Sequence, residues 1–282
     1  MSPGVLLAVL FGALLHASWN VLVKRTPDKL LATAGVFIGS GVIAAVIVPW
    51  LPLPAIAAWP YLAASTIAEV LYAALLARAY HLGDLSHAYP LMRGTPPLLV
   101  AAGSVLLAHE PLAWWTGAGI ALVCAGILSL VLAPANGSTA PQGPATRTAL
   151  INACVIASYT LIDGLGVRAS GHPISYILWL FLLTGSAWLL WAVFAAGRAR
   201  QQALLNDVSR VLTGGAFSLS SYGIALWAMT RAPIAAVAAV RETSIVFGVI
   251  LGRAMLAERI TPARALAVLL VMAGVYLIRS HR

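Results

Sequence analysis

The chain has 282 residues, of which 61% are hydrophobic and only 9% are charged, and its mean hydropathy is +0.93. Because an ordinary soluble domain carries about 25% charged residues, this composition excludes a soluble enzyme or binding domain and indicates an integral membrane protein. Lysine and arginine number 17 against 8 acidic residues, which gives a net charge of +9. In a membrane protein such an excess is typical of loops that face lipid headgroups, and no nucleic-acid motif accompanies it.

Ten apolar segments have roughly the 20-residue length that a membrane-spanning helix needs. The runs are too long for barrel strands, so we predict an all-α integral membrane protein with ten transmembrane helices. Short loops between the segments place neighbouring helices antiparallel. The predicted spans are residues 4–23, 30–50, 58–80, 85–107, 112–133, 148–169, 173–196, 205–229, 232–256 and 261–279.

The longest uncharged break between spans follows the fifth span and is rich in proline, glycine, serine and threonine. It divides the chain into two sets of five spans. We therefore predict a first five-helix repeat at residues 1–133, a linker at 134–147 and a second five-helix repeat at 148–282.

The two halves resemble each other in sequence. Arg93 and Glu110 recur 148 residues later as Arg241 and Glu258, and a glycine-rich span follows each glutamate. Because each half has an odd number of spans, a duplication would place the halves in opposite orientations. In such inverted repeats the solute site lies near the membrane midplane at the repeat interface.

The most informative stretch is Tyr89-Pro90-Leu91-Met92-Arg93-Gly94-Thr95-Pro96-Pro97, inside the fourth span. An arginine at mid-bilayer costs about 2.5–3.5 kcal/mol and normally faces a protein interior or a watery cavity. The three prolines remove backbone donors and disturb the helix. A charge beside a broken helix is how many transporters build a solute site, and the alternative is a buried arginine that only locks helices together.

Helical spacing groups other polar and aromatic side chains on shared faces of the first, third and sixth spans. Such stripes either line a cavity or join helices by hydrogen bonds. The candidate substrate-binding residues are Arg93, Glu69, Tyr89, Tyr72, His16, Trp19, Asn20, Tyr159, Asp163, Arg241 and Glu242.

The charges in this set predict contacts and a substrate class. Glu69 and Arg93 lie on antiparallel neighbouring spans at depths that differ by roughly one helical turn, so we expect them to form an ion pair. Arg93 and Arg241 would favour an anionic group, whereas Glu69, Asp163 and Glu242 would favour an amine. Together they suit an anionic or zwitterionic solute.

Protons are the expected coupling ion if transport is coupled, and the titratable candidates are Glu69, Glu242, His16 and His87. Membrane lipid is the other expected partner. Cys124 and Cys154 form no CxxC motif and have no histidine at metal-ligand spacing. We therefore predict no metal or cofactor and expect both cysteines to be small core residues.

The sequence resembles the EamA-type transporters of the drug/metabolite transporter superfamily over nearly its whole length. The resemblance rests on five plus five spans, on His16-Ala17-Ser18-Trp19-Asn20, and on the turns at Glu110 and Glu258. It implies a multi-pass protein of the cell (inner) membrane that exports a metabolite or drug by alternating access. Scarce lysine with abundant alanine, leucine and glycine is typical of a GC-rich bacterial gene.

Several alternatives stay open at this point. No HExxH, GxSxG or repeated acidic metal motif is present, so an enzyme is not expected. A passive facilitator, a channel-like permease or a non-transporting receptor or assembly subunit fits the same spans. Eleven basic residues flank the ends of the odd-numbered spans against four on the other side, which predicts external termini. The resemblance implies cytoplasmic termini instead.

Overall fold

The fold is described from a computed structural model, which defines residues 1–82, 85–132, 143–256 and 261–280. Within these ranges the secondary structure consists of helices, and no strand is present. In chain order the helices are α1 (Pro3–Lys24), α2 (Lys29–Ile47), η1 (Val48–Trp50), η2 (Ile56–Ala58), α3 (Trp59–Leu82), α4 (Leu85–Gly94), α5 (Pro96–Leu107), α6 (Trp114–Leu128), η3 (Ser129–Leu132), α7 (Gly143–Ala169), α8 (Pro173–Phe194), α9 (Arg198–Asn206), α10 (Val208–Met229), α11 (Ile234–Arg241), α12 (Ser244–Leu256) and α13 (Pro262–Ser280).

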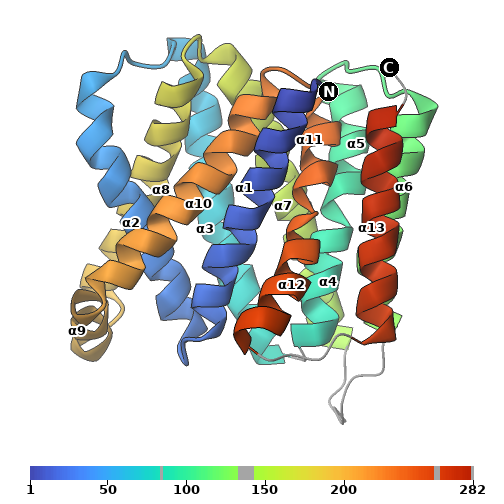
Figure 1. Cartoon of the computed structure of the whole chain (residues 1–282). Helices are drawn as coiled ribbons and strands as arrows, with labels where there is room; N and C mark the ends of the chain where they lie inside the picture. The colour runs from blue at the N-terminus through green and yellow to red at the C-terminus, as the bar shows by residue number, and fades with distance from the viewer. Residues whose placement is uncertain (83–84, 133–142, 257–260, 281–282) are drawn as a thin grey trace.

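The long helices stand side by side in one bundle, and α1 begins at the same end of the bundle at which α13 ends (Figure 1). Nine segments of the described chain are long and apolar enough to cross a membrane, which confirms the all-α membrane class. The fourth predicted span, residues 85–107, is not one of the nine. It consists of two helices of 10 and 12 residues, α4 and α5, which separate at Thr95.

The structure differs from the sequence prediction at the end of the linker and at Cys154. Helix α7 begins at Gly143, within the predicted linker 134–147, whose residues 134–142 lie outside the described residues. The structure buries Cys124 as expected, but Cys154 is exposed, so the prediction of a core position is wrong for Cys154. It lies on α7 one turn before Ser158, which is also exposed, and residues four apart share a helical face.

Helix α9 is a short additional helix at one end of the bundle (Figure 1), and the predicted eighth span therefore begins at Val208 and not at 205. None of the residues of α9 is buried. Its Arg200 lies 2.9 Å from Asp28, which also caps α2 by accepting from the Leu31 N–H. Burial alone would raise the pKa of Asp28, but the Leu31 and Arg200 donors hold that pKa below its ordinary value.

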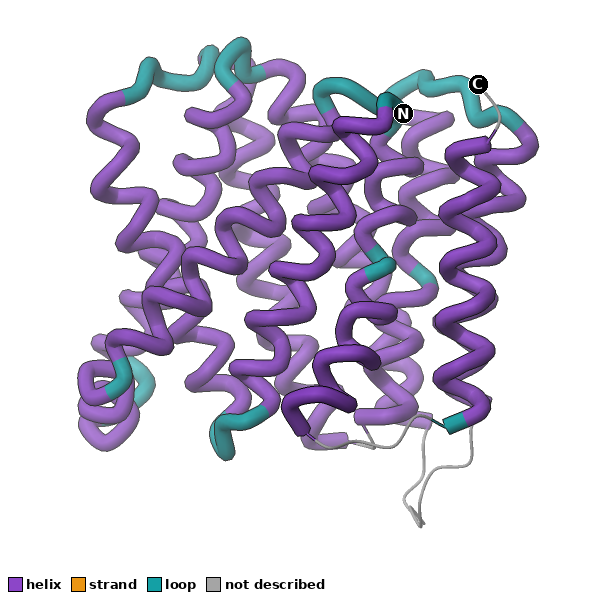
Figure 2. The backbone as a smooth tube through the Cα atoms, viewed as in Figure 1, coloured by secondary structure: helices purple, strands orange, loops and turns teal. Residues whose placement is uncertain are grey.

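Two spans are interrupted near the middle of the bundle, where Figure 2 shows two short loop segments inside otherwise helical paths. One interruption is at Thr95 and the other at Glu242–Thr243, 148 residues further on. In Figure 1 the chain rises from α4 to α5 but descends from α11 to α12. The two broken spans are therefore antiparallel equivalents.

The two interruptions have different local causes. Pro96 and Pro97 occupy the first positions of α5, where the absence of a backbone N–H carries no penalty but prevents a continuous ladder from α4. The second interruption contains no proline. There the Glu242 and Thr243 N–H groups donate to carbonyls three residues earlier, which tightens the helix into a 3-10 turn.

Helices α6 and α13 pack together through small residues. A Cβ at Gly119 would lie 2.7 Å from the carbonyl oxygen of Gly274, and one at Gly126 would lie 3.0 Å from that of Ala267. A shift of 148 residues relates position 119 to 267 and position 126 to 274. The contact of Gly119 with Gly274 is therefore equivalent to the contact of Ala267 with Gly126. Equivalent units related by a two-fold axis make contacts of this reciprocal kind, and small residues allow the close backbone approach.

Candidate functional site

A cavity of about 50 Å³ lies next to the two helix interruptions. It has room for a few water molecules and is far smaller than the roughly 300–1,000 Å³ of a pocket for a drug-sized ligand. In this conformation the cavity therefore has room only for a small solute or water. The cavity is lined by His16, Trp19, Phe37, Glu69, Tyr72, Arg93, Tyr159, Phe181, Ser218, Tyr222 and Arg241.

Aromatic rings form one continuous wall of the cavity. The Tyr159 ring lies edge-on between Tyr72 and Tyr222, with centroid distances of 5.9 and 6.1 Å. Tyr222 in turn contacts Phe181 at 6.4 Å. Edge-to-face pairs of this kind stabilise one another and hold the rings rigidly, so the wall has a defined shape.

The charges at the interruptions pair differently from the prediction. We expected Arg93 to pair with Glu69, but Arg93 Nη2 lies 2.9 Å from Glu242 Oε2. Glu69 Oε2 instead accepts a hydrogen bond from the Thr184 hydroxyl at 2.9 Å. The 3-10 turn at the end of α11 places Glu242 beside Arg93, and no proline in the sequence indicates that turn.

Asp163 is fully buried behind the aromatic wall. Its Oδ1 accepts from the Tyr176 hydroxyl at 2.9 Å and its Oδ2 from the Tyr222 hydroxyl at 2.6 Å. Both carboxylate oxygens are therefore occupied by protein donors. Asp163 positions Tyr222 and does not itself reach the cavity lining.

Arg241 lines the cavity from the end of α11, and its side chain stacks on Tyr222. The guanidinium carbon lies 4.9 Å from the centroid of the Tyr222 ring, which is within cation–π distance. The residue is 5% exposed, and no acceptor among the described residues hydrogen-bonds to its buried Nε and Nη1 atoms.

The structure brings most of the predicted site residues to the cavity and leaves some outside its lining. Glu242, Asp163 and Tyr89 are not among the lining residues. The Asn20 side chain donates to the His16 carbonyl of its own helix, 2.7 Å away. His87 Nε2 hydrogen-bonds to the Thr146 hydroxyl at 2.7 Å, outside the lining.

Four lining residues were not predicted: Phe37, Phe181, Ser218 and Tyr222. A signal for two of them exists in the sequence, because Ser218 and Tyr222 stand four residues apart in an apolar span and so share a helical face. Phe37 and Phe181 carry no such signal, since a phenylalanine in an apolar span is ordinary.

A cluster of polar contacts closes one end of the bundle. Glu110 Oε1 lies 2.6 Å from Arg168 Nη2, and its Oε2 accepts from the Ile234 N–H at 2.9 Å. Arg168 also donates to the carbonyls of Met229 and Ala232, at 2.7 and 3.0 Å. Glu110 thus caps the N-terminus of α11 from the other half of the chain, and we call these five residues the end clamp.

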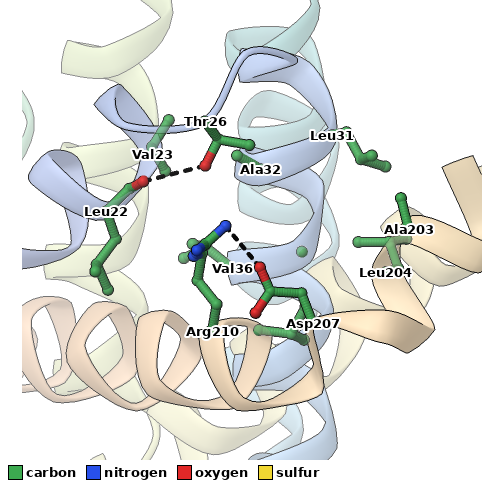
Figure 3. A pocket seen from close by; sticks show the side chains of 12 residues that line it. Leu22, Val23, Thr26, Leu31, Ala32, Val36, Ala203, Leu204, Asp207 and Arg210 are labelled. Carbon is green, nitrogen blue, oxygen red and sulfur yellow. Dashed lines mark hydrogen bonds and ion pairs between the residues drawn. The ribbon is translucent and has the colours of Figure 1, made fainter.

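A second cavity, of about 210 Å³, lies near α9 between the ends of α1, α2 and α10 (Figure 3). Its lining is mostly aliphatic. Its two charged residues, Asp207 and Arg210, pair with each other at 2.6 Å, and the Thr26 hydroxyl donates to the Leu22 carbonyl. Because its charges are paired internally, this cavity is a poorer site for a polar solute than the central one.

Comparisons with known proteins agree with this architecture. Residues 146–280 match the model of the EamA-like transporter family, which confirms the EamA-type resemblance for this part of the chain. A solved structure titled "Crystal structure of protein" is similar with a TM-score of 0.71 and 19% sequence identity, over 98% of this chain and 95% of that one. At that identity the likeness shows the fold alone. The curated proteins gave no match.

Proposed function

We propose, from the EamA-like transporter unit at residues 146–280, that this multi-pass membrane protein is a small-solute transporter that works by alternating access. The observation that carries the proposal is the meeting of two interrupted spans at a cavity near the centre of the bundle. Interrupted helices at the interface of repeats form the solute site in many transporters. The proposed direction is export of a metabolite or drug across the inner membrane, as the resemblance implies.

We further propose that residues 1–133 and 148–282 are two inverted repeats that rock against each other. Three observations support this: the interruptions lie 148 residues apart, their spans run in opposite directions, and the α6–α13 contacts are reciprocal. The Arg93–Glu242 pair and the end clamp both join one half to the other. Opening the clamped end therefore requires Glu110 to release Arg168 and the Ile234 N–H.

The lining residues are the proposed substrate contacts, and Glu69 is the proposed proton carrier. Glu69 reaches the cavity and accepts from the neutral Thr184 hydroxyl, whereas Glu242 is paired with Arg93. Replacement Glu69→Gln keeps the shape of the side chain but removes its titration. It is expected to abolish the pH dependence of flux, and an unchanged pH profile would assign coupling to another group or to facilitated diffusion.

Transport is tested with the purified full chain in proteoliposomes loaded with a mixture of amino acids, nucleosides, sugars, organic acids and phosphorylated metabolites. Mass spectrometry identifies what leaves the vesicles. Ser218→Trp fills the cavity and is expected to stop the flux, whereas Ser158→Trp, on an exposed position of α7, is expected to keep it. Absence of flux from wild-type vesicles would contradict the transport function, and wild-type flux through Ser218→Trp would contradict the cavity as its route.

A further inference from the structure

Arg241 and Arg93 occupy equivalent places in the two halves but differ in their acidic partners. Arg93 pairs with Glu242, the residue that follows Arg241. Under the 148-residue shift the equivalent of Glu242 is the residue that follows Arg93, which is Gly94. By symmetry, the residue that would pair with Arg241 is therefore Gly94, which has no side chain and so no carboxylate.

The consequence is visible at the Arg241 guanidinium. Within the described part of the chain Arg241 forms no ion pair, and its Nε and Nη1 donors have no hydrogen-bond acceptor. The Tyr222 ring beneath it supplies a cation–π contact but no acceptor atom. A buried charge with unpaired donors is costly to the fold.

The carboxylates nearest to the site form no ion pair with Arg241. Glu242 is directed to Arg93, and both oxygens of Asp163 accept from tyrosine hydroxyls. Glu69 lines the same cavity but accepts from Thr184. Arg93 also has Nε and Nη2 donors without a hydrogen-bond acceptor, but its charge is paired with Glu242. Among the described lining residues, Arg241 is therefore the arginine whose charge no carboxylate pairs.

We propose that Arg241 binds an oxyanion of the transported solute, a carboxylate or a phosphate. The inference rests on the proposed transport function and names the substrate class for that site. Arginine presents several N–H donors in a fixed plane and binds such oxyanions through charge-assisted hydrogen bonds. The aromatic wall of Tyr72, Tyr159 and Tyr222 receives the rest of the solute, and the cavity of about 50 Å³ selects a compact one.

The proposal is tested by direct binding, with inorganic phosphate and sodium acetate as probes. Thermal unfolding of the purified full chain is followed during titration of each probe at constant ionic strength, held with sodium chloride. Both probes are expected to stabilise the wild type, and Arg241→Gln is expected to weaken their apparent affinity at least about tenfold, the loss of a hydrogen bond to a charged group. Equal affinities in wild type and Arg241→Gln, or no stabilisation of the wild type, would overturn the proposal.

Arg231 provides a matched control. Its guanidinium lies 5.0 Å from the centroid of the Trp227 ring, as Arg241 lies over Tyr222, but Arg231 is exposed and outside the cavity. Arg231→Gln is expected to keep the wild-type affinity for both probes. A tenfold loss in this variant as well would mean that the probes respond to overall charge, which would also overturn the proposal.

A second pair of variants tests the symmetry argument if Arg241→Gln fails to fold. Gly94→Glu supplies the acidic residue that Arg241 lacks, and Gly94→Ala adds the same Cβ without the charge. A Cβ at Gly94 would lie 2.9 Å from the Leu128 side chain and 3.1 Å from that of Ile127, so the alanine variant controls for the shift that the Cβ itself requires. The glutamate variant is expected to lose oxyanion binding and the alanine variant to retain it, and equal binding by both would contradict the inference.

The binding assay and the flux assay separate the two proposals. If vesicles show no flux but oxyanions bind in an Arg241-dependent manner, the transport function fails and the site assignment stands. If flux is found only for solutes that lack an anionic group, and Arg241→Gln transports them like wild type, the substrate class fails and the transport function stands.

Discussion

The Arg93–Glu242 ion pair is the contact whose removal is expected to damage this protein most. The two side chains are 7% and 5% exposed and lie 2.9 Å apart. At an effective dielectric constant of about 20, Coulomb attraction at that distance is about 6 kcal/mol, part of which offsets the desolvation of both charges. Removing one partner leaves the other charge buried alone, which costs about 3–5 kcal/mol.

A double-mutant cycle measures the interaction free energy between Arg93 and Glu242. Arg93→Met and Glu242→Gln are each expected to destabilise the protein by about 3–5 kcal/mol. The double variant is expected to be more stable than the sum of the two losses predicts, with a coupling energy of about 2–3 kcal/mol. Unfolding in mixed detergent micelles, followed by circular dichroism, gives the four free energies. Flux is expected to be lost in both single variants, because the pair joins the two interrupted spans.

The exposed pair of Asp28 with Arg200 is the control for the cycle. It has a similar separation of 2.9 Å, but its side chains are 35% and 44% exposed. Solvent screening reduces such pairs to about 0–1 kcal/mol, so Asp28→Asn with Arg200→Gln should give little coupling. Additive losses in the Arg93–Glu242 cycle, or equal coupling in both cycles, would refute the reasoning that burial makes the central pair strong.

Three further outcomes are expected. Gly39→Ala places a Cβ against the backbone carbonyl of Val211 and should destabilise by at least about 1–3 kcal/mol, whereas Gly248→Ala, with open space around it, should be tolerated; equal unfolding midpoints would contradict this. Glu110→Ala removes the acceptor that caps α11 and should cost about 1–2 kcal/mol, with faster hydrogen exchange at the start of α11. Because the folded-state pKa of Asp28 is lowered, its contribution is present above the unfolded-state pKa and is lost as the pH falls through the folded-state value. Asp28→Asn at pH 7 should therefore accelerate hydrogen exchange in α9, and unchanged rates would show that this contact does not hold α9.

The sequence alone was sufficient for the membrane class, and it singled out seven of the eleven residues that line the central cavity. Membrane helices can be recognised from composition, because a run of about 20 apolar residues without charge is typical of a membrane-spanning helix. Because arginine is rare within such apolar runs, Arg93 and Arg241 could be identified as candidate functional residues without coordinates. The prolines at 96 and 97 likewise marked the first interruption, because proline acts on its own backbone wherever it stands.

The partners of these charges were decided by tertiary structure. A rise of 1.5 Å per residue predicts how deep a side chain lies along a span, but it says nothing about which neighbouring helix that side chain meets. The sequence predicted Glu69 as the partner of Arg93, but the partner is Glu242, because the 3-10 turn after α11 and the packing of the bundle bring Glu242 beside Arg93. For the same reason the contacts of Tyr222 with Arg241 and Asp163 emerged only in the fold. Lateral contacts arise from packing between helices, which the spacing of residues within one helix does not encode.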